Sequence, residues 1–399
     1  MVIQVGKINN VGFKSSVVQN STEVTISAKN KNINELNYVT PDYNVKLPQK
    51  YQKLGVEKLD NGLEIHSYKL ANGHRITIVP MEGSPTTVKN YVSVGSLNET
   101  EDIKGISHFL EHMAFNGTNG ENGYIKLNTG DSFKKIDAIG GWTNASTSFA
   151  VTDYVNSAPG LEDKDLEEQI KVIASMTEDL ALTDAMIEKE KGPVCQEINM
   201  IMDRPQTIAF DQNVRTLFGI KSSADELVAG SVNHIQNLTR ADVKKYYDKY
   251  YTPNNMNLVI TGEVNPDEVM QLVAKNFKSQ KKSVEQKYEV PFYPINKPER
   301  KDFLTDKTSE THVILGFSGP KNNDARAIVL EDVVSSYLYS TNIGIDKELK
   351  KMGTSFFFDC QKVSTNPNNP KYLSLITSCS DDNSEKVIKL FYDKLSNIK

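Results

Sequence analysis

The stretch GISHFLEHMAF, residues 105–115, decides how the rest of this sequence is interpreted. Its apolar residues recur at steps of three and four, which is the spacing of one face of an amphipathic helix. Asn116-Gly117 follows directly, and this pair is a suitable signal for the end of a helix. We therefore predict a helix that starts near Lys104, stops near Asn116 and buries the apolar side chains of Ile106, Phe109, Leu110 and Met113.

This predicted helix also carries two histidines and a glutamate on one face. His108 and His112 are four residues apart, so their imidazoles project from the same side, one turn apart. This spacing suits two ligands of a single tetrahedral Zn²⁺ ion. Glu111 flanks the same face, and the order His-x-x-Glu-His is one of the known metalloprotease signatures. The alternative is a pair of surface or core-edge histidines that bind no metal.

A catalytic zinc ion needs a third protein ligand and an open position for water. Candidate acids lie in MIEKEKGPVCQEINM, residues 186–200, where Glu190 and Glu197 are seven residues apart and share a helical face. Taken alone, these two acids would be ordinary surface charges. Pro193 lies between them, and an internal proline removes one backbone hydrogen bond. We therefore expect either a kink near residue 189 or a helix that starts just before Pro193.

Strand and helix patterns occur in two similar sets along the chain. The first set opens with a β-hairpin over residues 64–80. A strand and a helix over 148–182 resemble in pattern a strand and a helix over 371–395. We predict an α+β fold of two related domains, each an antiparallel-type sheet packed with helices. The predicted boundaries are 1–55 for an N-terminal arm, 56–280 for the zinc-bearing domain, 281–305 for a charged linker, and 306–399 for a second domain that ends early.

Composition excludes several classes of function. The 399 residues include 46 Lys+Arg and 51 Asp+Glu, and the net charge of −5 argues against the basic face that nucleic-acid binding needs. No apolar run approaches the roughly 18 residues of a membrane span, and the N-terminus lacks a secretory signal pattern. Three widely spaced cysteines indicate neither a disulfide framework nor a Cys-type zinc site. We therefore expect a cytoplasmic protein with no nucleic-acid or membrane partner.

One family resemblance rests on these motifs. HFLEHMAFNGT, residues 108–118, with a distal Glu-x6-Glu pair resembles the M16 metallopeptidases, the family of pitrilysin, insulin-degrading enzyme and the mitochondrial processing peptidases. The resemblance covers roughly residues 60–399. It implies an M16/LuxS-like fold and zinc-dependent hydrolysis of peptide bonds in unfolded or extended peptides.

The resemblance also implies roles for particular residues, carried over by motif position. His108, His112 and Glu197 would be the ligands of one zinc ion per chain. Glu111 would be the general base, and Glu190 would be a second acid that supports the site. This assignment selects Glu197 rather than Glu190 as the third ligand.

A further stretch, GGWTNASTSF at residues 140–149, resembles the family's edge strand. The resemblance implies that Asn144, Ala145 and Ser146 bind the backbone of the substrate peptide. A peptide that pairs with an exposed sheet edge is recognised mainly through main-chain hydrogen bonds, which tolerate many sequences.

The sequence departs from the family in ELKKMGTSFFF, residues 348–358. Catalytic assemblies of the family use an Arg and a Tyr, seven apart, to hold the substrate, but Lys350 and Phe357 fall nearest those positions. Lysine cannot reproduce a bidentate guanidinium, and phenylalanine lacks the hydroxyl. The chain thus resembles the zinc-bearing N-terminal half of a two-half enzyme, whose C-terminal half or second subunit would complete a closed chamber. Phe356, Phe357 and Phe358 are themselves predicted to form a strand packed in a core.

The sequence therefore predicts a zinc metalloendopeptidase that uses a metal-activated water. Two alternatives remain open. The chain could be a non-catalytic peptide-binding scaffold subunit, although the intact His/Glu/His motif with Glu197 argues against this. It could also be a catalytic half that is inactive without its partner half, which the departure at Lys350 and Phe357 favours. The remaining histidines lack acidic or Cys partners at ligand spacing and are predicted to be surface residues or structural residues with satisfied hydrogen bonds; they are His66, His74, His234 and His312.

Overall fold

Two compact units make up the chain. The first unit joins residues 32–198 with 228–288, and the second unit joins 1–31 with 199–227 and 289–399. No helix among the residues described is long and apolar enough to cross a membrane. The computed structural model describes residues 2–5, 50–160, 163–218, 228–281, 297–303, 308–321, 323–340, 344–361 and 370–396.

A seven-stranded sheet forms the centre of the first unit, in the order β2-β3-β4-β8-β5-β7-β6. Neighbouring strands run antiparallel except β4 and β8, which are parallel. The hairpin predicted over 64–80 is present as β3 and β4. The strands are β2 (Tyr51–Lys58), β3 (Glu64–Leu70), β4 (Arg75–Pro80), β5 (Thr86–Val92), β6 (Trp142–Thr147), β7 (Thr152–Ala158) and β8 (Met256–Gly262).

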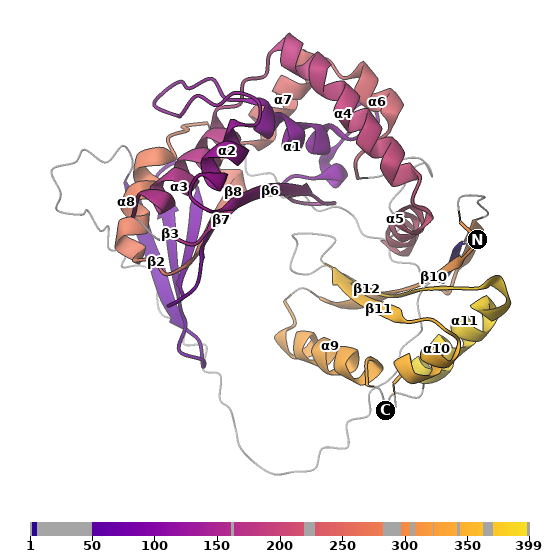
Figure 1. Ribbon diagram of the computed structural model, residues 1–399. Coiled ribbons are helices and arrows are strands. Elements are labelled where there is room, and N and C mark those ends of the chain that lie inside the picture. The colour runs from indigo at the N-terminus through magenta and orange to yellow at the C-terminus, as the bar shows by residue number, and fades with distance from the viewer. Residues whose placement is uncertain are drawn as a thin grey trace. The chain divides into compact units, whose positions relative to one another are not determined.

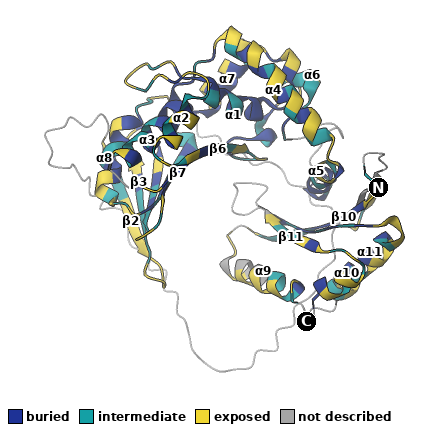
Figure 2. Ribbon diagram, in the orientation of Figure 1, coloured by how far each residue is buried: buried dark blue, intermediate teal, exposed yellow. Residues whose placement is uncertain are grey.

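Helices pack on this sheet, with α3 and α8 against its central strands and α1 and α2 near β6 (Figure 1). Along β5 and β8, fully buried residues alternate with partly buried ones, so one face of each strand is packed more tightly than the other. The edge strand β2, by contrast, is largely exposed (Figure 2). The helices of this unit are α1 (Ile106–Asn116), α2 (Asp131–Asp137), α3 (Asp163–Glu178), α4 (Asp184–Met202, whose last residues are grouped with the second unit), α6 (Val232–Asn237), α7 (Arg240–Tyr250) and α8 (Pro266–Asn276), with short 3₁₀ turns at Ser96–Asn98 and Pro253–Asn255.

Helix α4 contains Pro193 in its interior and is one helix from Asp184 to Met202. The alternative of a helix that starts just before Pro193 is therefore wrong. Ile187, Val194 and Ile198 are almost fully buried along one side of α4. Packing of this apolar side offsets the hydrogen bond that the proline removes, because tertiary packing supplies most of the stability of a helix in a protein.

Two strands lie in the segment predicted to be an N-terminal arm. β2 pairs with β3 at the edge of the first sheet, and its sequence YQKLGVEK ends in five exposed residues. It therefore lacks the alternation by which a half-buried strand is recognised. β1 (Val2–Val5) pairs with two strands of the second sheet, and residues 6–49 lie outside the described residues.

The second unit contains a five-stranded sheet in the order β11-β12-β10-β1-β9. Its antiparallel set β11-β12-β10 repeats the arrangement of β6-β7-β5 in the first sheet, and a helix follows β12 as one follows β7. The predicted fold class, two related α+β domains, is confirmed. The remaining elements are β9 (Arg300–Phe303), β10 (Thr311–Lys321), β11 (Phe356–Gln361), β12 (Pro370–Cys379), α5 (Pro205–Phe218), α9 (Ala325–Leu338), α10 (Asp346–Lys351) and α11 (Asp381–Ser396).

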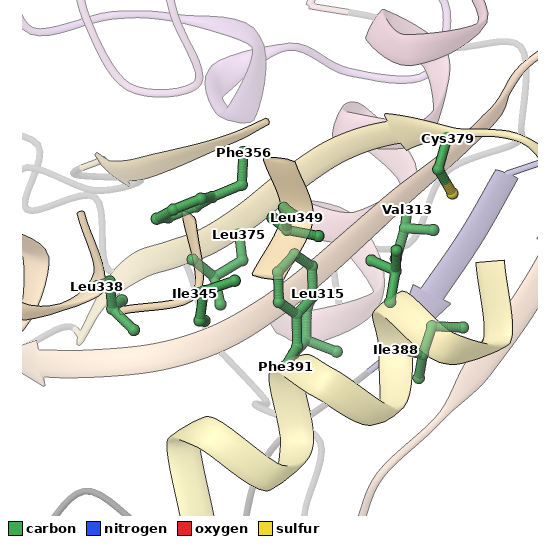
Figure 3. Close-up of a cluster of buried hydrophobic side chains, with 11 residues drawn as sticks. Val313, Leu315, Leu338, Ile345, Leu349, Phe356, Leu375, Cys379, Ile388 and Phe391 are labelled. Atoms are coloured by element: carbon green, nitrogen blue, oxygen red, sulfur yellow. The ribbon is translucent and has the colours of Figure 1, made fainter. Parts of the chain in front are cut away.

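Both faces of β10 are covered in this unit. Val313 and Leu315 belong to a hydrophobic core shared with α9, α10 and α11 (Figure 3), whereas Ile314, on the opposite face, packs with Ala209 of α5. Contacts therefore group α5 with the second sheet. The boundaries predicted from the sequence instead include this helix in the zinc-bearing domain, 56–280. β9 lies within the predicted linker, and residues 282–296 of that linker are outside the described residues.

The prediction that three consecutive phenylalanines pack in a core is wrong for one of them. Phe356 is buried and Phe358 packs against the same core, but the side chain of Phe357 is 58% exposed. Successive side chains point to opposite faces of a strand, so the middle residue of the three faces away from this core.

Candidate metal centre and active site

A buried glutamate fixes the start of helix α1. Gly105 precedes the first turn with φ of 88°, a left-handed conformation that glycine adopts without strain. Glu99 accepts the backbone N–H of Gly105 at 2.8 Å and that of Ser107 at 2.9 Å. These bonds satisfy donors that the first turn of a helix leaves unpaired. Burial raises the pKa of Glu99 to about 7, although both hydrogen bonds favour the charged form. This anchor therefore holds the first turn of α1, which contains His108.

Three polar side chains from α1 and α4 meet beside each other. Nε2 of His112 lies 3.1 Å from one carboxylate oxygen of Glu197, and Nε2 of His108 lies 3.7 Å from the other. One ligand atom from each of the three residues lies within 4.8 Å of the other two. Hydrogen bonding to His108 and the charges of both imidazoles lower the pKa of Glu197 to about 2. The structure therefore brings the three predicted ligands together, while their role as ligands remains a prediction.

Glu190 contacts His112 at the ring nitrogen that does not face Glu197. One of its oxygens lies 3.0 Å from Nδ1 of His112, and the other accepts a hydrogen bond from Nδ2 of Asn116 at 2.6 Å. Burial disfavours the charged form of His112, but the hydrogen bond to Glu190 and the neighbouring acids outweigh it and raise the pKa of this imidazole. A carboxylate on one ring nitrogen fixes the ring and its tautomer, as is usual for metal-binding histidines. Nδ1 of His108 has no such partner among the described residues.

Glu111 is oriented by the sheet rather than by its own helix. The hydroxyl of Thr147, at the end of β6, donates a hydrogen bond of 2.5 Å to one oxygen of Glu111. Burial raises the pKa of Glu111, against the opposing effects of this hydrogen bond and of the two histidines. A carboxyl group whose pKa is raised is better matched to accepting and returning a proton near neutral pH.

The two histidines and three glutamates line a cavity of about 460 Å³, and no lysine or arginine is among the described residues of its lining. Such a concentration of negative charge favours a bound cation. Ligand atoms on a tetrahedral zinc ion are about 3.3 Å apart, which falls between the two His–Glu197 distances. Two imidazole nitrogens and one carboxylate are also a known set of zinc ligands, so the donors fit this metal. The lining residues are His108, Glu111, His112, Phe115, Asn116, Thr129, Gly130, Phe133, Asn144, Ala145, Glu190 and Glu197.

The predicted substrate-binding residues lie on β6, the last strand in the order of the first sheet. β6 pairs with β7 on one side, and no described strand pairs with its other edge. That edge can therefore accept a further strand. Asn144 and Ala145 line the cavity. Ser146 does not line it, and its hydroxyl donates instead to Asp153 at 2.8 Å.

Sequence reasoning missed four residues of this region. Asn116 follows His112 by one helical turn, a spacing that could have suggested contact. Thr147 and Glu99 approach α1 from other elements, so no local pattern indicated them. Phe133 of α2 stacks on Phe115 of α1, with ring centroids 4.9 Å apart, and gives the cavity an apolar wall.

Two models of one family match two successive segments of the chain. The model described as Insulinase (Peptidase family M16) matches residues 82–230, and the one described as Peptidase M16 inactive domain matches 237–399. The chain belongs to the M16 peptidase family. The histidine motif of this M16 chain lies in the first matched segment, as does the cluster of candidate metal ligands.

Named relatives agree with this assignment. The M16 chain is 30% identical over 284 residues to an uncharacterized zinc protease, YmxG, of Bacillus subtilis. The aligned segment covers 69% of this chain and 65% of that protein. It is 31% identical over 230 residues to the zinc protease PqqE of Helicobacter pylori, covering 57% and 49%. It is 29% identical over 208 residues to the mitochondrial-processing peptidase subunit beta of Bos taurus, covering 52% and 40%. The matched part is thus between 40% and 65% of the length of these relatives.

A solved structure shows the same fold. A protease from Helicobacter pylori superposes with a TM-score of 0.67 at 24% identity, covering 82% of this M16 chain and 79% of that chain. Together, the family models and the relatives support a peptidase-like function, and zinc is the metal that the names of the relatives imply.

Proposed function

We propose that this chain is a zinc-dependent metalloendopeptidase with one zinc ion held by His108, His112 and Glu197. The observation that carries the proposal is the convergence of two imidazole nitrogens and a carboxylate within 4.8 Å. They lie in a cavity whose other charged residues, in the described part of the chain, are the acids Glu111 and Glu190. When bound, zinc would supply Lewis-acid activation of a water molecule and of the scissile carbonyl.

Glu111 would move the proton in this reaction. Its carboxylate lines the same cavity as the candidate ligands and would take a proton from the attacking water, then return it to the leaving amine. Glu190 would act through His112, because its hydrogen bond to Nδ1 keeps Nε2 turned toward Glu197 and the metal position.

The substrate would be an unfolded or extended peptide. An extended chain could add as a strand to the edge of β6, where Asn144, Ala145 and Ser146 would offer main-chain groups. Two of these three residues line the cavity, so a peptide paired there would pass the candidate metal position. The stacked rings of Phe115 and Phe133 would contact an apolar side chain of that peptide.

Replacement of Glu111 by Gln tests the proposal. The amide has almost the same size but cannot accept the proton, so we expect Glu111→Gln to keep zinc and to lose hydrolysis of a fluorogenic extended peptide. Glu188→Gln is the matched control, because Glu188 lies on α4, is exposed and pairs with Lys191 outside the cavity. Turnover at the wild-type rate in Glu111→Gln, assayed with the complete protein, would exclude Glu111 as the base.

A second proposal concerns what else the reaction needs. Lys350 forms an ion pair with Asp346 of its own helix, and Phe357 is exposed on the edge strand β11. Neither side chain can hold a peptide carbonyl as an arginine and a tyrosine would. We propose that a C-terminal half or a second subunit supplies these groups and completes a closed chamber, so that this chain alone is a catalytic half of low activity. A peptide-binding scaffold without catalysis is disfavoured by the full set of His108, Glu111, His112 and Glu197.

A further inference from the structure

Thr147 is the residue through which the sheet contacts Glu111. It is the last residue of β6, and its Oγ1 lies 2.5 Å from Oε2 of Glu111, which is on α1. Among the described residues, this hydroxyl is the hydrogen-bond donor to that carboxylate. A threonine hydroxyl can donate only one hydrogen bond, so this contact commits its proton to Glu111.

We propose that Thr147 is a positioning residue that holds the Glu111 carboxylate in the orientation needed to receive a proton. The inference rests on the proposed function, in which Glu111 is the base, and extends it to a residue that neither the motif nor the family resemblance indicated. The second oxygen of Glu111 would then be the one presented to water.

Two physical features make one hydroxyl effective here. Glutamate has three side-chain torsions, and a base must lie within hydrogen-bond reach of the proton that it takes. A carboxylate held in one orientation is therefore a more effective base than a mobile one. Hydrogen bonds to charged groups are also about twice as strong as neutral ones. Because Thr147 is partly buried, water competes less for this bond than it would at the surface.

The position of Thr147 also connects two parts of the site. Thr147 continues the strand that contains Asn144, Ala145 and Ser146, and it pairs with Thr152 of β7. A peptide added to this strand would therefore order the backbone that carries the Glu111 donor. Substrate pairing and orientation of the base would be coupled through the same strand.

The strand itself supplies a matched control. Thr143 lies four residues earlier on the same face of β6 and is 8% exposed, and its hydroxyl has no hydrogen-bond partner among the described residues. Threonine to valine replaces a hydroxyl by a methyl group of similar size and keeps the β-branched shape. Thr143→Val and Thr147→Val thus make the same chemical change, and only the second removes a donor from Glu111.

The experiment uses zinc-loaded protein carrying glutamate labelled with ¹³C at the carboxyl carbon. The Glu111 signal is assigned by its absence in Glu111→Gln. We expect Thr147→Val to shift this signal at a fixed pH, with zinc content unchanged, and Thr147→Ser to restore it because serine keeps the donor. Thr143→Val should leave it in place. In the complete enzyme, Thr147→Val should lower kcat by roughly 10- to 100-fold with little change in KM, and Thr147→Ser should recover most of this loss.

The outcomes separate this inference from the function on which it rests. Wild-type turnover in Glu111→Gln would contradict the proposed base, whatever Thr147 does. An inactive Glu111→Gln, together with an unshifted Glu111 signal and a wild-type kcat in Thr147→Val, would overturn the role of Thr147 alone. Thr147→Ala is the second donor-free variant. If Thr147→Val and Thr147→Ala both lost zinc or failed to fold, Thr147 would have a structural role only, and this result would also overturn the proposal.

Discussion

Replacing Asn116 by Ala should weaken zinc binding although Asn116 is not a candidate ligand. Its Nδ2 donates to Glu190 at 2.6 Å, and the other oxygen of Glu190 lies 3.0 Å from Nδ1 of His112. Asn116 is 5% exposed and Glu190 is 9% exposed. Without the amide, Glu190 loses a partner in a place that water reaches poorly, and its hold on His112 is weakened.

The size of the effect follows from these contacts. A hydrogen bond to a charged group contributes about 1.5–3 kcal/mol. If this free energy is lost only in the metal-bound state, the dissociation constant for zinc rises by roughly 10- to 150-fold. A loss of roughly 10- to 100-fold is typical when a residue that orients a metal-binding histidine is replaced, so the two ranges largely overlap.

Competition with a chromophoric chelator measures this dissociation constant directly. Asn128→Ala is the matched control, because Asn128 also donates to a carboxylate, that of Asp131 at 2.9 Å, but does so at an exposed site outside the cavity. We expect the control to bind zinc as the wild-type protein does. An unchanged zinc affinity in Asn116→Ala would refute the reasoning that Glu190 acts on the metal site through His112.

Three further predictions concern other parts of the molecule. Burial lowers the pKa of His74 to about 4, so below pH 6.5 the imidazole takes up a proton in the unfolded chain but not in the native state. The contribution of His74 to the free energy of unfolding should therefore fall by about 2 kcal/mol from pH 7 to pH 5. Unfolding in urea should show that the stability of the wild-type protein relative to His74→Gln falls by this amount between the two pH values. Glu99→Ala removes both hydrogen bonds at the start of α1 and should lower the free energy of unfolding by about 2 kcal/mol, and an unchanged denaturation midpoint would show that the anchor is not needed. The chain alone should cleave a fluorogenic peptide orders of magnitude more slowly than the chain supplied with its C-terminal half or second subunit, because orientation of the substrate contributes several kcal/mol; equal rates would mean that the site is self-sufficient.

The sequence predicted the parts of the molecule that depend on local periodicity. Helix α1 spans Ile106–Asn116, as the spacing of its apolar residues and the Asn116-Gly117 pair indicated. The four predicted residues of the metal site and Glu190 line one cavity for the same reason, since spacings of four and seven residues place side chains on one helical face. The pattern within each helix did not predict which neighbouring element would meet that face.

The features that the sequence did not predict depend on contacts between distant segments or on unusual exposure. Thr147 and Glu111 are 36 residues apart, and Glu99 meets Gly105 through a turn with no regular period. β2 carries polar residues because it is an edge strand, so its pattern resembles that of a loop. Phe357 is apolar yet exposed on β11, and no rule based on hydrophobicity distinguishes it from its two neighbours.

Elemental analysis of zinc tests the central claim most directly. Protein prepared without added metal, then exposed to a slight excess of zinc and desalted, should retain one zinc ion per chain. His112→Ala should retain almost none, whereas His234→Ala should match the wild-type protein, because His234 bonds to Ser231 outside the cavity. A zinc content near zero in the wild-type chain, or one that is unchanged in His112→Ala, would contradict the proposed metal centre.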